Sequence, residues 1–187
     1  MKAPLLQLIF TALVFTGLIS CSKEDSAEDN ASELAGEYAL VSMTSDIAVD
    51  LNNDGIASTN LLDELGPGVL NTGSPGLEIK PVLLDNELVQ VMSFFLPHPK
   101  VDFNLPEPAV EYSIKGIGYQ YEFNKQTNKI TIDNGDDPIG TVTATGNLVN
   151  IEVAGEGALD AVIIKYYYDF ATDTWILLTI SCGYEQE

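Results

Sequence analysis

The sequence contains no arginine, one histidine and two cysteines, and these shortages exclude several classes of function. All 8 basic residues among the 187 are lysines, against 28 Asp and Glu residues, and the formal net charge is −20. Such a chain would repel nucleic-acid phosphates, and it has no guanidinium group to bind them in a bidentate manner. We therefore expect no nucleic-acid partner, whereas divalent cations are natural counterions.

The scarcity of histidine and cysteine also limits the catalytic chemistry. His98 alone cannot build a histidine-based zinc site or a catalytic triad, and its two proline neighbours predict a solvated loop. Cys182 shares alternate-residue spacing with Ile176, Leu178 and Ile180, which indicates a buried side chain rather than a nucleophile. We therefore predict that the protein is not an enzyme. A glycan hydrolase that uses two of the many carboxylates is the less favoured alternative.

The N-terminal segment predicts where the protein is located. Residues 5–19 form an apolar run behind a single lysine, shorter than the roughly 20 residues that a membrane-spanning helix needs. The run ends in Leu18-Ile19-Ser20-Cys21, which resembles a bacterial lipoprotein box. This resemblance implies that residues 1–20 are removed as a signal peptide and that the Cys21 thiol is acylated, for example with palmitate. An ordinary secretory signal with an incidental cysteine is the alternative.

The next segment, residues 21–33, is acidic and polar, as is typical of a solvated tether. Its Lys23-Glu24-Asp25 sequence resembles a sorting signal that sends some Bacteroidota lipoproteins to the outer face of the outer membrane. A plain tether has the same composition. We predict an outer-membrane lipoprotein, and its display on the outer face is a separate prediction.

Residues 34–187 have the pattern of a single all-β domain. Apolar and polar residues alternate over residues 117–123, as in a half-buried strand. Similar runs cover residues 38–43, 77–84, 88–96, 129–133, 140–144, 148–153, 160–170 and 174–182. Short turns such as Asn134-Gly135 join several of them. We predict an antiparallel meander or barrel of about eight or nine strands, with the proline-rich residues 97–108 as a long loop or edge crossover.

The segment 50–58 has the spacing of a calcium loop. Oxygen-bearing side chains occupy EF-hand positions 1, 3, 5 and 9, a glycine occupies position 6, and a backbone carbonyl is available at position 7. These residues are Asp50, Asn52, Asp54, Ser58, Gly55 and Ile56. We predict one stabilising calcium ion of weak affinity, because position 12 is a leucine. The alternative is a turn that caps the following helix and binds nothing.

A short helix is expected directly after this loop. Ser58 or Asn60 can cap it, leucines at 61, 62 and 65 give it an apolar side, and a Gly-Pro-Gly sequence ends it. Asp63 and Glu64 lie on this helix, and either carboxylate would close the calcium site if the loop is longer than an EF-hand loop.

Aromatic residues form two stripes with the spacing of strands. Tyr119, Tyr121 and Phe123 share one face of a predicted strand, and Tyr166, Tyr168 and Phe170 share one face of another, with Tyr167 opposite. In a barrel of about eight strands, such side chains either fill the interior or line a pocket for one small apolar ligand. Both alternatives are open from the sequence.

Three segments together resemble the lipocalin-like lipoproteins of Bacteroidota: the lipoprotein box, residues 34–40 and residues 50–65. The first strand of lipocalins carries Gly-x-Trp, and here Gly36-Glu37-Tyr38 has tyrosine instead. The resemblance implies a lipocalin-like barrel and a lipid-anchored binding protein of the cell envelope. A structural or assembly partner at the outer membrane, with a filled core and no ligand, is the alternative function.

Overall fold

The structure is a computed structural model that describes residues 33–70, 73, 75–106, 108–133 and 145–187. The predicted signal peptide, nearly all of the tether, the strand at 140–144 and the Asn134-Gly135 turn lie outside the described residues. Among the described residues, no helix has the length and apolar character needed to cross a membrane.

The described residues form nine strands and two short helices. In chain order they are β1 (Gly36–Val49), β2 (Ser58–Asn60), α2 (Leu61–Leu65), α3 (Pro67–Leu70), β3 (Leu77–Leu84), β4 (Glu87–Asp102), β5 (Ala109–Asn124), β6 (Lys129–Asp133), β7 (Asn147–Gly155), β8 (Ala158–Asp169) and β9 (Thr174–Gln186). The helix α2 has the predicted bounds, with Asn60 as its N-cap and Gly66 at its C-terminal end. The strands β3 and β6 also begin and end where the sequence predicts.

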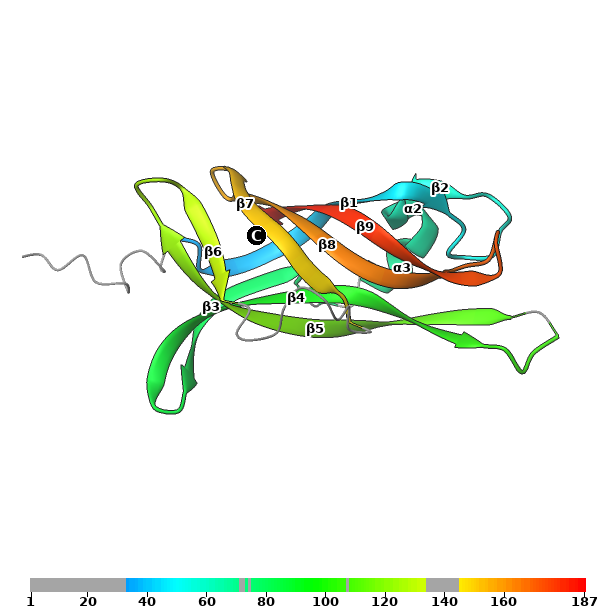
Figure 1. Ribbon diagram of the computed structural model, residues 1–187, viewed down its shortest axis with the longest axis horizontal. Coiled ribbons are helices and arrows are strands. Elements are labelled where there is room, and N and C mark those ends of the chain that lie inside the picture. Colours follow the sequence, from blue (N-terminus) through cyan, green and yellow to red (C-terminus); the bar gives the residue numbers. More distant parts are fainter. Residues whose placement is uncertain (1–32, 71–72, 74, 107, 134–144) are drawn as a thin grey trace, which may run out of the picture.

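All strands belong to one antiparallel sheet in the order β6-β5-β4-β3-β1-β9-β8-β7, with β2 added to β1. The sheet folds over, so that β1, β8 and β9 lie above β3, β4 and β5 (Figure 1). The strand β1 pairs with both β3 and β9 and joins the two halves. No pairing joins β6 to β7 within the described part, although these end strands approach one another. The predicted all-β antiparallel meander is confirmed, and it forms a barrel with one open seam.

The proline-rich residues 97–108 were predicted as a long loop or edge crossover, and this prediction is wrong for residues 97–102, which belong to β4. Pro97 and Pro99 lie in β4, opposite Ile114 and Tyr112 of β5. Phe95 donates its N–H to the carbonyl of Gly76, on the side away from β5. Alternate residues of a strand direct their nitrogen atoms to the same side, so the nitrogens of Pro97 and Pro99, like that of Phe95, face away from β5. At these positions β4 has passed Leu77, the first residue of β3, and has no β3 partner on that side. The missing N–H groups therefore remove no bond of the β4–β5 ladder.

His98 consequently lies half-buried in β4 rather than in a solvated loop. The connection between β4 and β5 is reduced to the residues between Asp102 and Ala109.

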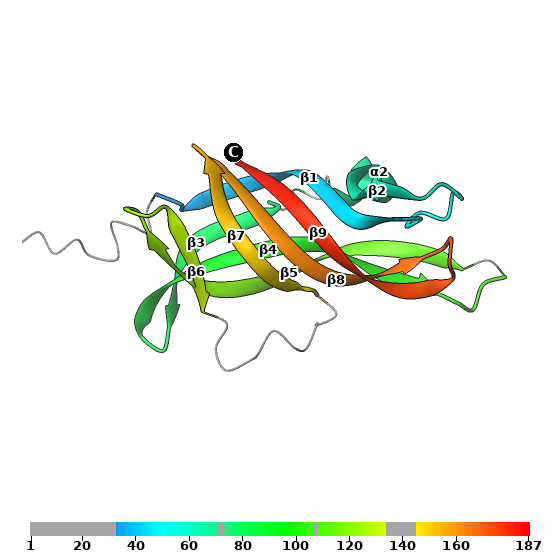
Figure 2. The ribbon, with the colours of Figure 1, turned by 45° about the horizontal axis from the view of Figure 1, so that its top comes forward.

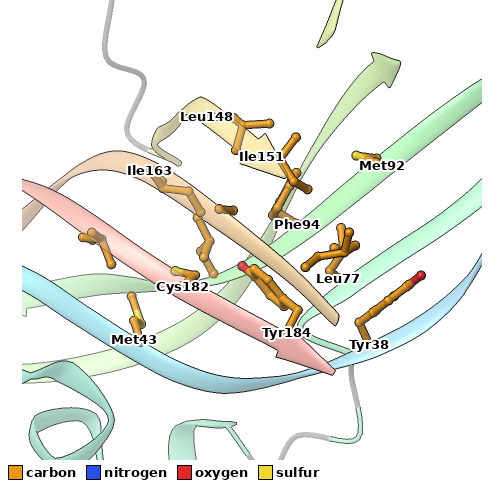
Figure 3. Packing of buried hydrophobic residues seen from close by; sticks show 14 of the residues in the cluster. Tyr38, Met43, Leu77, Met92, Phe94, Leu148, Ile151, Ile163, Cys182 and Tyr184 are labelled. Atoms are coloured by element: carbon orange, nitrogen blue, oxygen red, sulfur yellow. The ribbon is translucent and has the colours of Figure 1, made fainter. Parts of the chain in front are cut away.

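The interior between the two halves of the sheet is filled by side chains. Figure 3 shows Phe94, Leu77 and Tyr184 pointing toward one another from β4, β3 and β9. The ring of Phe94 makes edge-to-face contacts with Tyr184 at 5.9 Å and with Tyr119 at 6.1 Å between centroids. A continuous cluster of buried residues surrounds them. Among the described residues, the observed interior fits the alternative of core packing.

The parity predicted for β8 is reversed in the structure. Odd-numbered residues face the interior, including the fully buried Lys165 and Tyr167, whereas Tyr166 is 42% exposed on the outer face. Because three tyrosines follow one another, they do not indicate which face of β8 is buried. The charged residues Lys165 and Asp169 occupy inward positions that alternation assigns to the surface. Tyr166 therefore lines no interior pocket.

Candidate functional site

The loop after β1 is folded around the carboxylate of Asp50. This side chain is only 1% exposed, and its two oxygens accept the N–H of Asn53 at 2.7 Å and of Gly55 at 2.9 Å. Asn52 and Asp54 in turn accept the N–H groups of Asp54 and Ile56. Asn53 and Gly55 have φ angles of 63° and 83°, a region that suits asparagine and glycine. The alternate oxygens therefore hold a tight turn.

The helix α2 brings Glu64, and not Asp63, to this loop. Glu64 is 5% exposed, and its Oε2 accepts the N–H of Leu51 at 2.9 Å. Asp63 is exposed and accepts a hydrogen bond from the Asn60 amide. Burial raises the pKa of Glu64, the hydrogen bond from Leu51 opposes this, and the negative charges of Asp50 and Asp54 raise the pKa further. The structure thus brings the carboxylate of Glu64, rather than that of Asp63, into contact with the loop.

Two residues that the sequence did not single out fasten the loop to the sheet. Asp169, at the end of β8, is 2% exposed and accepts the N–H of Asp50 at 2.9 Å. The carbonyl of Asp50 accepts the N–H of Phe170 at 2.9 Å. On the other side, the hydroxyl of Tyr112 donates to the carbonyl of Leu51 at 2.9 Å. The residues that make these contacts are 61 to 119 positions apart in the sequence, so local sequence patterns do not predict them.

The remaining predicted calcium ligands are Ser58 and the backbone carbonyl of Ile56. The hydroxyl of Ser58 accepts the N–H of Asn60, and the side chain of Ile56 is 69% exposed. Across the described ranges, no three side chains of His, Cys, Asp or Glu gather closely enough to hold a metal ion. Ion binding would therefore require the carboxylates of Asp50, Asp54 and Glu64 to move closer together.

The five residues of the predicted ligand pocket do not share one cavity. The hydroxyl of Tyr119 accepts the N–H of Leu148 at 2.9 Å and so links β5 to β7 across the open seam. Phe123 packs against the core. Tyr168 lies in a separate cluster, with its ring 5.7 Å from that of Trp175. Of the five residues, Tyr121 alone belongs to the open pocket described next.

This pocket lies where β4 and β5 diverge. Their pairing ends at Val91 and Gln120, after which β4 continues beside β3 and β5 beside β6, and both ribbon views show the two hairpins separating (Figures 1 and 2). The pocket between them has a volume of about 440 Å³ and is open to solvent. It is lined by Val89, Gln90, Gln120, Tyr121, Glu122, Thr131, Ile132 and Asp133.

Two lining residues carry buried polar atoms that have no hydrogen-bond partner in the described part of the chain, namely Gln90 Oε1 and the Tyr121 hydroxyl. Tyr121 is 5% exposed. Burial raises the pKa of Tyr121 to about 12, with a further contribution from Tyr38, so the hydroxyl is neutral and able to donate at physiological pH. An unpaired buried polar group costs about 1–3 kcal/mol. Two residues that line the pocket therefore each carry a buried polar atom without a partner.

Comparison of the chain with protein-family models, curated proteins and solved structures gives no match.

Proposed function

We propose that this protein is a lipid-anchored, non-enzymatic binding protein of the cell envelope, and that its ligand site is the pocket between the diverging ends of β4 and β5. The observation that carries the proposal is the presence of two unpartnered buried polar atoms, Gln90 Oε1 and the Tyr121 hydroxyl, in residues that line one pocket of the described structure. A ligand that forms hydrogen bonds with both atoms removes the free-energy cost of leaving them unsatisfied.

The lining residues define the chemistry of the ligand. Val89 and Ile132 offer apolar surface, and Gln90 offers an acceptor that requires an N–H or O–H donor. Glu122 and Asp133 at the pocket, together with the net charge of −20, disfavour an anion. We infer an uncharged amphiphile that carries a hydrogen-bond donor beside an apolar segment.

Native mass spectrometry of the full chain, purified from its host membranes in detergent, tests this proposal. We expect a small organic molecule that remains bound in the folded protein and is released on denaturation. The variants Gln90→Leu and Tyr121→Phe should lower its occupancy, because each removes one polar atom at nearly constant volume. Tyr112→Phe, which alters a tyrosine outside the pocket, is the matched control. A bare wild-type chain, or equal occupancy in all variants, would contradict the proposal.

The filled interior favours a second candidate function, a structural or assembly partner at the outer membrane. The space around Phe94 and Tyr184 is filled by the protein's own side chains. Chemical cross-linking in intact host cells distinguishes the two functions. One stoichiometric protein adduct, together with an empty pocket in the mass spectrum, would select the assembly role.

The lipid anchor is part of the proposal and rests on the Leu18-Ile19-Ser20-Cys21 box. We expect the intact mass of the mature chain to show diacylated Cys21 as the first residue. Cys21→Ser should prevent acylation and release the protein from membranes. An unmodified Cys21, or cleavage at another bond, would refute the anchor. Added protease that fails to cleave the tether in intact cells would refute display on the outer face.

We also propose that the Asp50 loop binds one calcium ion that stabilises the fold. The support is the alternation of Asp50, Asn52 and Asp54, the tight turn at Gly55, and the delivery of the Glu64 carboxylate to the loop. Because the carboxylates must turn toward the ion, the affinity should be weak, in the range of about 10⁻⁴ to 10⁻³ M known for extracellular modules. Binding at a hundredfold excess over Kd stabilises the folded state by about 2.7 kcal/mol.

Thermal unfolding in calcium and in chelator tests this ion. A gain of about 2.7 kcal/mol corresponds to roughly 5–11 °C for a domain of this size. Glu64→Gln should abolish the difference, since it removes the charge and keeps an acceptor for the Leu51 N–H. Asp63→Asn, on the exposed side of the same helix, is the control and should retain the difference. Identical melting curves of the wild type in calcium and chelator would reduce the loop to a helix-capping turn.

A further inference from the structure

The hairpin formed by β3 and β4 extends beyond the sheet and is apolar on both faces. Its turn is formed by Asp85 and Asn86, both with positive φ. Leu83, Leu84 and Leu88 around the turn are 67%, 47% and 54% exposed. Both ribbon views show the hairpin projecting away from the body of the protein (Figures 1 and 2). Such a concentration of exposed leucine at one tip is unusual for a surface in water and indicates an interaction site.

The sheet register places this tip at the end of the molecule where the tether leaves. The strand β1 starts with Gly36 opposite Ile79 of β3. From Ile79, β3 continues in the direction in which the chain preceding Gly36 departs, and the turn at Asp85 lies roughly 20 Å further on at about 3.3 Å per residue. An ion pair between Glu33 and Lys125, at the turn between β5 and β6, holds the first described residue at this same end.

The length of chain before Glu33 limits how far the domain can stand from its anchor. The 12 residues 21–32 span at most about 43 Å when fully extended. A bilayer that carries the acyl chains of Cys21 therefore lies within reach of the hairpin tip, because the tip is at the end of the molecule where β1 begins. The Asp50 loop and Trp175 lie at the opposite end of β1 and β9.

From these observations we propose that the β3–β4 hairpin contacts the lipid surface and brings the pocket at its base to the membrane. This inference rests on the proposed function, in which Cys21 anchors the chain. Leu83, Leu84 and Leu88 enter the interfacial region of the bilayer, and the turn residues Asp85 and Glu87 keep their carboxylates hydrated among the headgroups at the same level. Val89 and Gln90 of the same hairpin line the pocket, so its uncharged amphiphilic ligand is taken from the bilayer.

The acidic tip selects the kind of bilayer. Asp85 and Glu87 lie at the turn, between Leu84 and Leu88, and the whole chain carries a net charge of −20. Repulsion from anionic headgroups opposes insertion, so a zwitterionic phosphatidylcholine surface should be contacted more closely than one rich in phosphatidylglycerol.

Tryptophan quenching by brominated phosphatidylcholine tests the contact. The full, acylated chain is reconstituted into vesicles with Leu84→Trp as its sole tryptophan, in combination with Trp175→Phe. We expect the emission to shift to shorter wavelength and to lose intensity when brominated lipid replaces ordinary lipid, and we expect a smaller loss with anionic lipid added. The wild type is the matched control: its Trp175, 45% exposed at the far end, should show no quenching.

A second arm separates failure of the hairpin from failure of the anchor. The Cys21→Ser chain with an N-terminal hexahistidine tag is held on vesicles that contain a nickel-chelating lipid. If the reporter is quenched in this arm and the untagged wild type does not float with vesicles, the hairpin contact is supported and the acyl anchor is rejected. Bound protein whose Leu84→Trp reporter is unquenched in either arm would overturn the hairpin proposal, whatever the state of Cys21.

Discussion

Replacement of Asp169 by alanine should detach the Asp50 loop from the sheet and destabilise the whole domain. The carboxylate of Asp169 accepts the N–H of Asp50 at 2.9 Å and of Ala171 at 3.2 Å, and the hydroxyl of Thr172 at 2.6 Å. Asp50 is buried, so water cannot replace its lost partner. Ala171 and Thr172 are exposed, and water can replace theirs.

The magnitude follows from this difference. A hydrogen bond to a charged group contributes about 1.5–3 kcal/mol, and an orphaned buried N–H costs a similar amount. The hydrogen bonds from the exposed Ala171 and Thr172 contribute less. The removal of one of many negative charges stabilises the folded state by under about 1 kcal/mol. We expect a net loss of roughly 2–3 kcal/mol in the free energy of unfolding, or a decrease of about 5–10 °C in Tm.

Urea unfolding followed by circular dichroism measures this change, with Asp160→Ala as the matched control. Asp160 lies on the same strand and its side chain is exposed, so its removal changes the net charge equally but removes no contact with the loop. If Asp169→Ala and Asp160→Ala unfold at the same urea concentration, the Asp169 carboxylate does not secure the loop and our reading of it is wrong.

Three further predictions concern the core. Phe94→Ala should lower the free energy of unfolding by about 3–5 kcal/mol, because the ring is fully buried between Tyr119 and Tyr184; a urea midpoint close to that of the wild type would refute this. Burial lowers the pKa of Lys165 to about 8 from its usual 10.5, so the unfolded chain binds more protons between these values and stability rises with pH. The wild type should gain about 2 kcal/mol between pH 7 and 9.5, and Lys165→Met should lack this gain; equal slopes in urea titrations would contradict the assignment. Burial also raises the pKa of Cys182 to about 12, so iodoacetamide should leave this thiol unmodified in the native protein and alkylate it in urea, and rapid native alkylation detected by mass spectrometry would disprove its burial.

The elements that the sequence predicted well are those defined by neighbouring residues. The helix α2 has its cap at Asn60 and its stop at Gly66, both adjacent to the leucines that they delimit. Regular alternation likewise located β3 and β6. Such local interactions specify where an element lies without any knowledge of the rest of the fold.

The errors arose where distant contacts override a local preference. Pro97 and Pro99 are tolerated in β4 because their nitrogens face away from β5, which depends on where β3 ends. The inward parity of β8 includes Lys165 and Asp169, and the position of Asp169 is explained by a partner 119 residues away. The pairing of β1 with both β3 and β9 was also beyond local patterns. The pocket at Tyr121 depends on where the pairing of β4 with β5 ends, which local patterns do not show, and so only one of its lining residues was predicted.

The two proposed sites should act independently, because the fold places them at opposite ends of one strand. The 14 residues of β1 span roughly 45 Å at about 3.3 Å per residue, with the pocket end at Gly36 and the Asp50 loop after Val49. Coupling over this distance would require an element with two discrete arrangements that both ligands bias, whereas β1 is paired on both sides near its start and packed into one core. Removal of calcium should therefore lower Tm and leave the occupancy of the pocket unchanged below the unfolding transition. Native mass spectrometry of the same preparation with and without chelator measures both, and loss of the organic ligand from chelated but folded protein would show that the two ends communicate.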